Sequence, residues 1–171
     1  MLNVKNIDKF DITKLVPIQL NITSGQPDLT VRVVPSPNFL LRDFQPIDSS
    51  VITITVQNRL RFRPPSVSGS DANNVAVYIY LSSHLQQVGN MGLPAGFQAV
   101  VTPDHHTVFC FGGTIPAGGS VDMIIEVIEV VGENWVGDAT IEAVVDPYNS
   151  ITENLEENNI GSGIIWVTRI N

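Results

Sequence analysis

Residues 51–56 read VITITV, and this run decides the fold class. Its side chains are β-branched, and apolar and polar residues alternate with a period of two. Successive side chains of a strand point to opposite faces of a sheet, so this period is typical of a strand with one buried face. The run therefore predicts a strand that sends Ile52, Ile54 and Val56 into the core.

Similar alternation recurs on both sides of this run. Proline, glycine and asparagine clusters separate the segments, as expected for turns between short strands. Further strands are expected at 29–34, 75–81, 107–111, 120–131, 137–145 and 163–170. The only helical turn considered lies at 151–157. About seven strands without a convincing helix predict an all-β, immunoglobulin-like antiparallel β-sandwich.

The core follows from the same alternation, because every second side chain of a strand shares one face. Trp166 is expected to pack near the core from the last strand, since an aromatic side chain there buries a large area. The other predicted core residues are Leu29, Val31, Ile52, Ile54, Val56, Val77, Ile79, Ile141, Ala143 and Val145.

Residues 1–26 are interpreted as an N-terminal arm, and residues 27–171 as the folded domain. Apolar residues alternate at Val16, Ile18, Leu20 and Ile22, beside Leu15, and Pro17 favours an edge position. Edge strands carry unpaired backbone groups that accept an added strand. We therefore expect residues 15–22 to pack along a sheet edge of a neighbouring copy. An ordinary first strand on its own domain is the alternative.

The stretch DPYNSITENLEENN at 146–159 is similar to the closing motif of the CARDB family, a bacterial and archaeal immunoglobulin-like domain. Upstream pieces agree in order: PDLTV at 27–31, ITITVQN at 52–58, VAVYIYLS at 75–82 and IPAGGSV at 115–121. The residues that carry the closing motif are Asp146, Pro147, Asn149, Glu153, Glu156, Asn158 and Asn159.

This resemblance implies the immunoglobulin-like fold and a role in cell adhesion. The chain departs from the family where Arg59 follows Asn58, because the family's second strand usually ends in Asn-x-Gly. The segments 59–74 and 83–106 are also longer than a minimal domain needs. Since loops on a rigid sandwich carry specificity, these insertions are where individual function is expected.

The loop at 146–159 concentrates oxygen donors, which are the ligands that Ca²⁺ prefers. A structural interpretation competes with a calcium site, because aspartate and asparagine side chains also bond to turn backbone and Asp146 can form an Asx-turn before Pro147. Both roles can coexist. The candidate calcium ligands are Asp146, Asn149, Glu153, Glu156 and Asn158.

The remaining motifs indicate no enzyme. The histidines of Asp104-His105-His106 and His84 lack zinc-ligand spacing, and no G-x-S-x-G elbow is present. Cys110, the only cysteine, lies between two phenylalanines and is interpreted as a buried small hydrophobe.

The sole basic cluster, at 59–63, offers Arg61 and Arg63 as candidate contacts to an acidic partner such as the glutamate-rich loop of another copy. A solvated strand end is the simpler interpretation of that cluster.

Composition narrows the remaining functions. Hydrophobic residues make up 43% of the chain, which supports a core without disulfides, and the formal net charge is −8. An acidic chain with few cations is not expected to bind nucleic acid, and no segment is apolar enough to span a bilayer. The first residues carry charges and do not form a Sec-type signal peptide. We expect an extracellular or particle-associated location.

Two functions remain. The first is a non-enzymatic structural or adhesion module, a self-assembling subunit of an extracellular filament or of a virion surface, whose partners are its own copies or other subunits of that assembly. The alternative is a monomeric carbohydrate- or calcium-binding module.

Overall fold

The computed structural model describes residues 25–42, 48–60, 69–130, 135–153 and 155–169. Within these ranges every regular element is a β-strand, so the all-β prediction is confirmed. The strands are β1 (Leu29–Ser36), β2 (Phe39–Arg42), β3 (Ser49–Asn58), β4 (Ala72–Leu81), β5 (Leu85–Gly92), β6 (Phe97–Val101), β7 (Thr107–Ile115), β8 (Ser120–Glu129), β9 (Gly137–Val145) and β10 (Ile160–Arg169).

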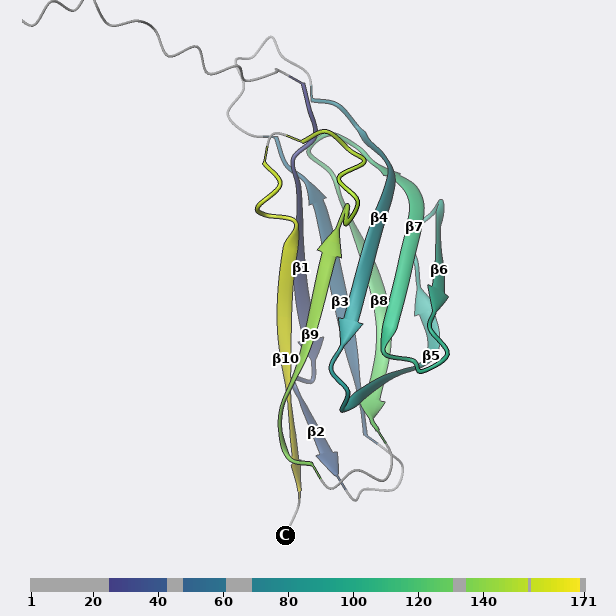
Figure 1. Cartoon of the computed structure of the whole chain (residues 1–171), viewed down its shortest axis with the longest axis vertical. Helices are drawn as coiled ribbons and strands as arrows, with labels where there is room; N and C mark the ends of the chain where they lie inside the picture. Colours follow the sequence, from purple (N-terminus) through teal and green to yellow (C-terminus); the bar gives the residue numbers. More distant parts are fainter. Residues whose placement is uncertain (1–24, 43–47, 61–68, 131–134, 154, 170–171) are drawn as a thin grey trace, which may run out of the picture.

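The strands form two sheets that face each other, the layered arrangement of an immunoglobulin-like sandwich (Figure 1). The four-stranded sheet has the order β1-β3-β8-β5, and the six-stranded sheet has the order β2-β10-β9-β4-β7-β6. Neighbouring strands are antiparallel except β2 and β10, which pair in parallel. The predicted antiparallel sandwich is therefore confirmed with one parallel pair at an edge.

Alternate residues of both sheets fill the core, as the sequence predicts. Nine of the predicted core residues are buried, and Val31 is half-buried at the edge strand β1. Cys110 is fully buried, and burial raises the pKa of its thiol to about 11. A thiol with so high a pKa is unreactive at neutral pH, in agreement with its interpretation as a small hydrophobe.

The prediction for Trp166 is wrong. Ile165 and Val167 are fully buried, so the residues between and beside them on β10 point to the opposite face. Trp166 is 49% exposed on the outside of the six-stranded sheet. The size of an aromatic side chain argued for burial, but strand alternation decides which face it takes.

Three strands were not expected from the sequence. Strand β2 follows β1 after only two residues but joins the other sheet. The prolines of this segment had predicted a connection without a strand. Strands β5 and β6 lie in a glycine-rich stretch with weak alternation. The described part of 151–157 contains no helical turn, because its side chains and backbone close a loop instead.

The predicted arm, including Leu15, Val16, Ile18, Leu20 and Ile22, lies almost wholly outside the described residues. No helix in the described part of the chain is long and apolar enough to cross a membrane.

Candidate functional site

Asp146 follows β9 directly and organises the loop that begins there. Its backbone has a φ of 45°, in the left-handed region that aspartate tolerates better than most residues. Its Oδ1 accepts hydrogen bonds from the Ser150 N–H at 3.0 Å and the Ser150 hydroxyl at 2.7 Å, and its Oδ2 accepts one from the Ile151 N–H at 2.8 Å. The carboxylate thus closes a wider turn than the expected Asx-turn, because its acceptors bond four and five residues ahead.

Glu153 links this loop to the start of β1. Only 9% of the residue is exposed, and its Oε2 accepts a hydrogen bond from the Leu29 N–H at 2.5 Å. Its Oε1 accepts one from the Asn159 side-chain amide at 3.0 Å. Burial, with a smaller contribution from the Glu156 and Asp146 carboxylates, raises the pKa of Glu153 to about 7 against the lowering effect of the two hydrogen bonds.

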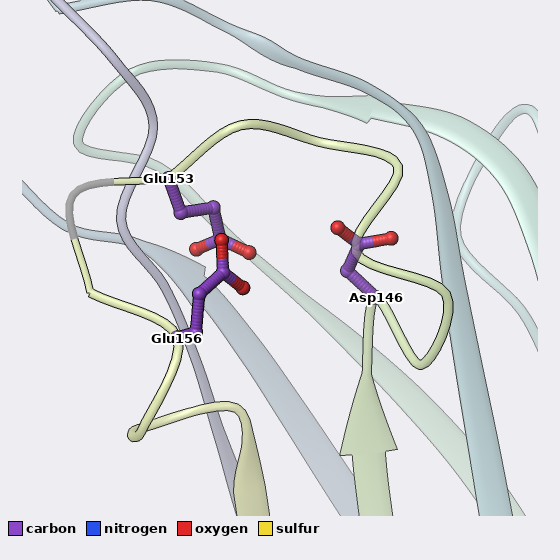
Figure 2. Close-up of side chains that lie close together, drawn as sticks. All are labelled: Asp146, Glu153 and Glu156. Carbon is purple, nitrogen blue, oxygen red and sulfur yellow. The ribbon is translucent and has the colours of Figure 1, made fainter.

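Glu156 completes a group of three carboxylates. Figure 2 shows Glu153 and Glu156 side by side, with Asp146 facing them from the end of β9. One oxygen from each of the three lies within 4.8 Å of the others. Asn159 donates to Glu156 Oε2 at 3.1 Å as well as to Glu153, so a single amide holds two of the three acids together.

Two buried oxygens near this group lack a hydrogen-bond partner. They are the Oδ1 atoms of Asn158 and Asn159, and Asn159 is only 5% exposed. A buried acceptor without a donor costs free energy unless water or a cation satisfies it. The loop therefore combines clustered carboxylates with oxygens that need a positive partner.

A second set of polar residues ties the loop to the sandwich. The Asn158 amide donates to Asp28 Oδ1 at 3.0 Å, and the Asp28 N–H donates to Asn58 Oδ1 at 3.2 Å. The buried Asn58 amide also donates to the carbonyls of Ser70 and Ile115 at 2.9 and 3.1 Å. Sequence reasoning did not assign Asp28 or Asn58, although both lie in pieces that resemble the CARDB family.

The other candidate ligand residues are dispersed. Asn149, predicted as a ligand with the three carboxylates, is exposed and has a φ of 48°. Asn158 is half-buried and turned toward Asp28. Arg61 and Arg63 lie outside the described residues. A calcium role for the five predicted ligands stays a prediction.

The histidines serve local structure. His106 Nδ1 lies 2.7 Å from the Leu85 carbonyl, and the His84 ring stacks on Trp135 with centroids 3.9 Å apart. Asp104 accepts hydrogen bonds from the Thr102 hydroxyl and the His106 N–H, and the first of these lowers its pKa most. The contacts of Asp104 and His106 shape the turn between β6 and β7, whereas His84 lies between β4 and β5 and its partner Trp135 lies between β8 and β9.

Aromatic rings form a ladder on the outer face of the six-stranded sheet, which sequence reasoning also missed. Neighbouring rings stack from Tyr80 to Tyr78, Phe109 and Phe111, with centroid distances of 5.6, 4.6 and 5.1 Å. Tyr148 meets Tyr78 edge-on, and their hydroxyls lie 2.6 Å apart. The sequence signal was the alternation of aromatic residues at 78 and 80, and at 109 and 111.

Further apolar side chains lie on the same face of the sheet as the ladder. Cross-strand pairs place Val100 beside Phe109, Ile160 beside Val144 and Phe39 beside Trp166, all on the same face of the sheet. We call this surface the outer face. Seven of its side chains are between 41% and 65% exposed: Phe39, Tyr80, Val100, Tyr148, Ile160, Ile164 and Trp166.

The comparisons with known proteins concern the fold. No family model and no curated protein sequence matches the chain. A crystal structure of a CARDB domain from Pyrococcus furiosus, described as a complex with di-metal ions, aligns with a TM-score of 0.54 at 15% identity and covers 86% of this chain and 94% of that chain. The fold is that of a CARDB domain.

A solution structure of that CARDB domain also has a TM-score of 0.54, at 16% identity, with 84% and 97% of the two chains covered. The major pilin subunit of Bacillus cereus aligns with a TM-score of 0.50 at 10% identity, over 84% of this chain and 41% of the pilin. The CARDB-like fold predicted from residues 146–159 is therefore confirmed, and likeness at such low identity concerns fold alone.

Proposed function

We propose that this chain is a non-enzymatic structural or adhesion module that assembles with other protein subunits, its own copies first, through the outer face. The observation that carries this proposal is the exposure of seven large apolar side chains on one face of the six-stranded sheet. Large apolar side chains that are exposed together on one face mark interaction sites in soluble proteins.

The size of the outer face suits a protein interface. Half-exposed aromatic side chains each offer roughly 100 Å² for burial. Together with their half-buried neighbours, the seven side chains therefore supply on the order of 800 Å², which is the area that each partner contributes to a standard interface. A fold shared with a pilin subunit is consistent with assembly outside the cell or on a particle.

The arrangement of the rings favours a protein over a carbohydrate partner. Sugar rings stack on the exposed flat faces of aromatic side chains, where the ring carries negative charge. In the ladder those faces are stacked against neighbouring rings, with interplanar angles of 16° to 25°. Tyr78 and Phe109 therefore offer edges to a partner, as rings do in packed protein interfaces.

Assembly should depend on the outer face in a measurable way. The double variant Ile164→Ser/Trp166→Ser is expected to weaken association at least tenfold in concentration, because it removes two half-exposed apolar side chains from the part of the outer face that β10 supplies. Sedimentation velocity at micromolar concentrations would measure this. The matched control is Val51→Ser/Ile124→Ser, which removes similarly exposed side chains from the other sheet. Monomeric wild-type protein, or equal dissociation of both variants, would contradict the proposal.

A second proposed role is divalent-cation binding by Asp146, Glu153 and Glu156. Their oxygens lie close together, and Asn158 and Asn159 supply buried oxygens that lack donors. Turning the Asn159 amide by 180° would replace its N–H donors with Oδ1 at the two glutamates, which suits a cation held between them. The CARDB domain of Pyrococcus furiosus is described with di-metal ions, which adds support.

Cation binding should raise the melting temperature. A ligand at 100 times its Kd stabilises the folded state by about 2.7 kcal/mol, which corresponds to roughly 5–10 °C for a chain of this size. Thermal melts with Ca²⁺, Mg²⁺, Mn²⁺ or a chelator would measure the shift. Glu156→Gln should abolish it, whereas Glu157→Gln, an exposed neighbour outside the group, should preserve it. If none of the three ions changes the melting temperature at millimolar concentration, the loop binds no cation and its role is structural.

A further inference from the structure

The two sides of the sandwich are covered unequally. On one side β1 packs closely against β10, where a Cβ added to Gly161 would lie 2.6 Å from the Val31 carbonyl oxygen. On the opposite side β5 and β6 end their sheets (Figure 1). Core side chains on that side are only partly buried, although they pack against the core: Met91, Leu93, Ala99 and Val101.

Of the four sheet edges in the described part of the chain, β6 is the one suited to accept a strand. The edge of β1 lies against β10, and β2 has only four residues. Strand β5 is irregular between Val88 and Gly92, and the Gln87 side chain donates to the Val88 and Gly89 carbonyls of its own strand. Such features blunt an edge. Strand β6 keeps one register with β7 over its whole length.

We infer that β6 accepts residues 15–22 of a second copy of this chain, added as an antiparallel strand. This inference rests on the proposed assembly of copies and names a contact for it. A strand added there would pair with the backbone of β6 and close the open side of the core, as in other cases of strand addition.

The apolar pattern of the arm matches this open side. Ala99 and Val101 point toward the core, whereas Val100 points to the outer face. Val16, Ile18, Leu20 and Ile22 share one face of an extended strand, and would cover Ala99 and Val101 together with Met91 and Leu93. Gln19 and Asn21 would then lie beside Val100 on the outer face.

Charge also favours the arm as occupant. Residues 1–24 carry three lysines and two aspartates, whereas the rest of the chain carries six arginines and fifteen acidic residues. All lysines of the protein lie within its first fourteen residues. An antiparallel strand would bring Lys14 to the end of β6, where Asp104 lies in the exposed turn before β7. Opposite charges therefore favour association of the lysine-bearing arm of one copy with the acidic domain of another.

Geometry favours a second copy over the same chain. Strand β1 packs against β10, and β6 lies four strand spacings from β10 in the other sheet, which with one layer spacing puts β6 roughly 22 Å from the start of β1. Six residues join Ile22 to Asp28 and span at most roughly 20 Å when fully extended. Gly25 lies in a turn with a φ of 119°, so this link is shortened. The arm therefore reaches another copy more readily than its own β6.

Disulfide trapping between two full-length variants tests the inference. One preparation carries Val100→Cys, and the other carries Gln19→Cys or Asn21→Cys; buried Cys110 stays unreactive. Mild oxidation of the mixture should yield a heterodimer whose linked peptides are identified by mass. Ile18→Cys and Leu20→Cys, on the opposite face of the added strand, should link at least tenfold less, as should a Gln86→Cys acceptor on β5.

The outcomes separate this inference from the proposed function. If the variants assemble as the wild-type protein does but form no disulfide at Val100→Cys, the β6 contact would be overturned. Assembly through the outer face would remain. A chain that carries both Val100→Cys and Gln19→Cys and links only to itself would also overturn it. Monomeric wild-type protein would overturn the proposed assembly, and the β6 contact with it.

Discussion

Replacing Asp146 with alanine is expected to lower the free energy of unfolding by about 3 kcal/mol, because two backbone N–H groups and one hydroxyl lose their acceptor. Alanine also tolerates a φ of 45° less well than aspartate. The residue is 1% exposed, so water replaces the lost acceptor poorly. Urea unfolding followed by tryptophan fluorescence would measure the change.

Two further variants isolate the cause of this loss. Asp146→Asn keeps a side-chain acceptor and a residue that tolerates positive φ, so its loss should be smaller. Asp138→Ala removes an exposed carboxylate from β9, the strand that precedes Asp146, and should change the free energy of unfolding by less than about 0.5 kcal/mol. Equal losses for Asp146→Ala and Asp138→Ala would refute the role of Asp146 in closing the loop.

Glu153 should make the folded protein less stable as the pH rises. The ordinary pKa of a glutamate, which applies to the unfolded chain, is 4.5, and the pKa of Glu153 in the folded protein is about 7. Between these values the folded state holds a proton that the unfolded chain has released. The stabilisation is therefore complete below pH 4.5 and is lost as the pH rises through 7. Because one pKa unit is about 1.4 kcal/mol, the loss is on the order of 2 kcal/mol after solvent screening.

This pH dependence is best measured as a difference between variants in the presence of chelator. Glu153→Gln cannot ionise, so its free energy of unfolding relative to wild type should improve by about 2 kcal/mol between pH 5 and pH 8. Glu157→Gln should follow wild type. A Glu153→Gln profile parallel to wild type would show that Glu153 has an ordinary pKa. A bound cation favours the ionised form and should cancel the loss at pH 8.

Glu153 lies where the acidic loop contacts the first residues of the folded domain, directly after the arm that we propose takes part in assembly. Its Oε2 accepts from the Leu29 N–H, and Asn158 donates to Asp28, so both hold the residues that follow the arm. Protonation or cation binding at the loop therefore acts where the arm joins the sandwich. The same contacts make the closing motif the link between the last turn and the first strand.

Alternation along the chain was enough to establish the class of fold. Each strand buries every second residue, so Ile52, Ile54 and Val56 could be assigned to the core without coordinates. The motif at 146–159 predicted a CARDB-like sandwich through its resemblance to that family, and in the structure Asp146 closes this loop by side-chain to backbone bonds over short spacings. Local pattern and local hydrogen bonding are properties that sequence carries directly.

Tertiary structure decided which face each strand turns outward and which distant residues meet. Trp166 is outside because Ile165 and Val167 fill the core, and that choice depends on the register of β10 against β9. The ring ladder joins Tyr78 to Phe109 across strands that sequence order separates by two others. Asp28 meets Asn158, which lies 130 positions later in the chain, only in the folded domain. Such contacts arise from strand order and sheet packing, which the alternation within a single strand does not encode.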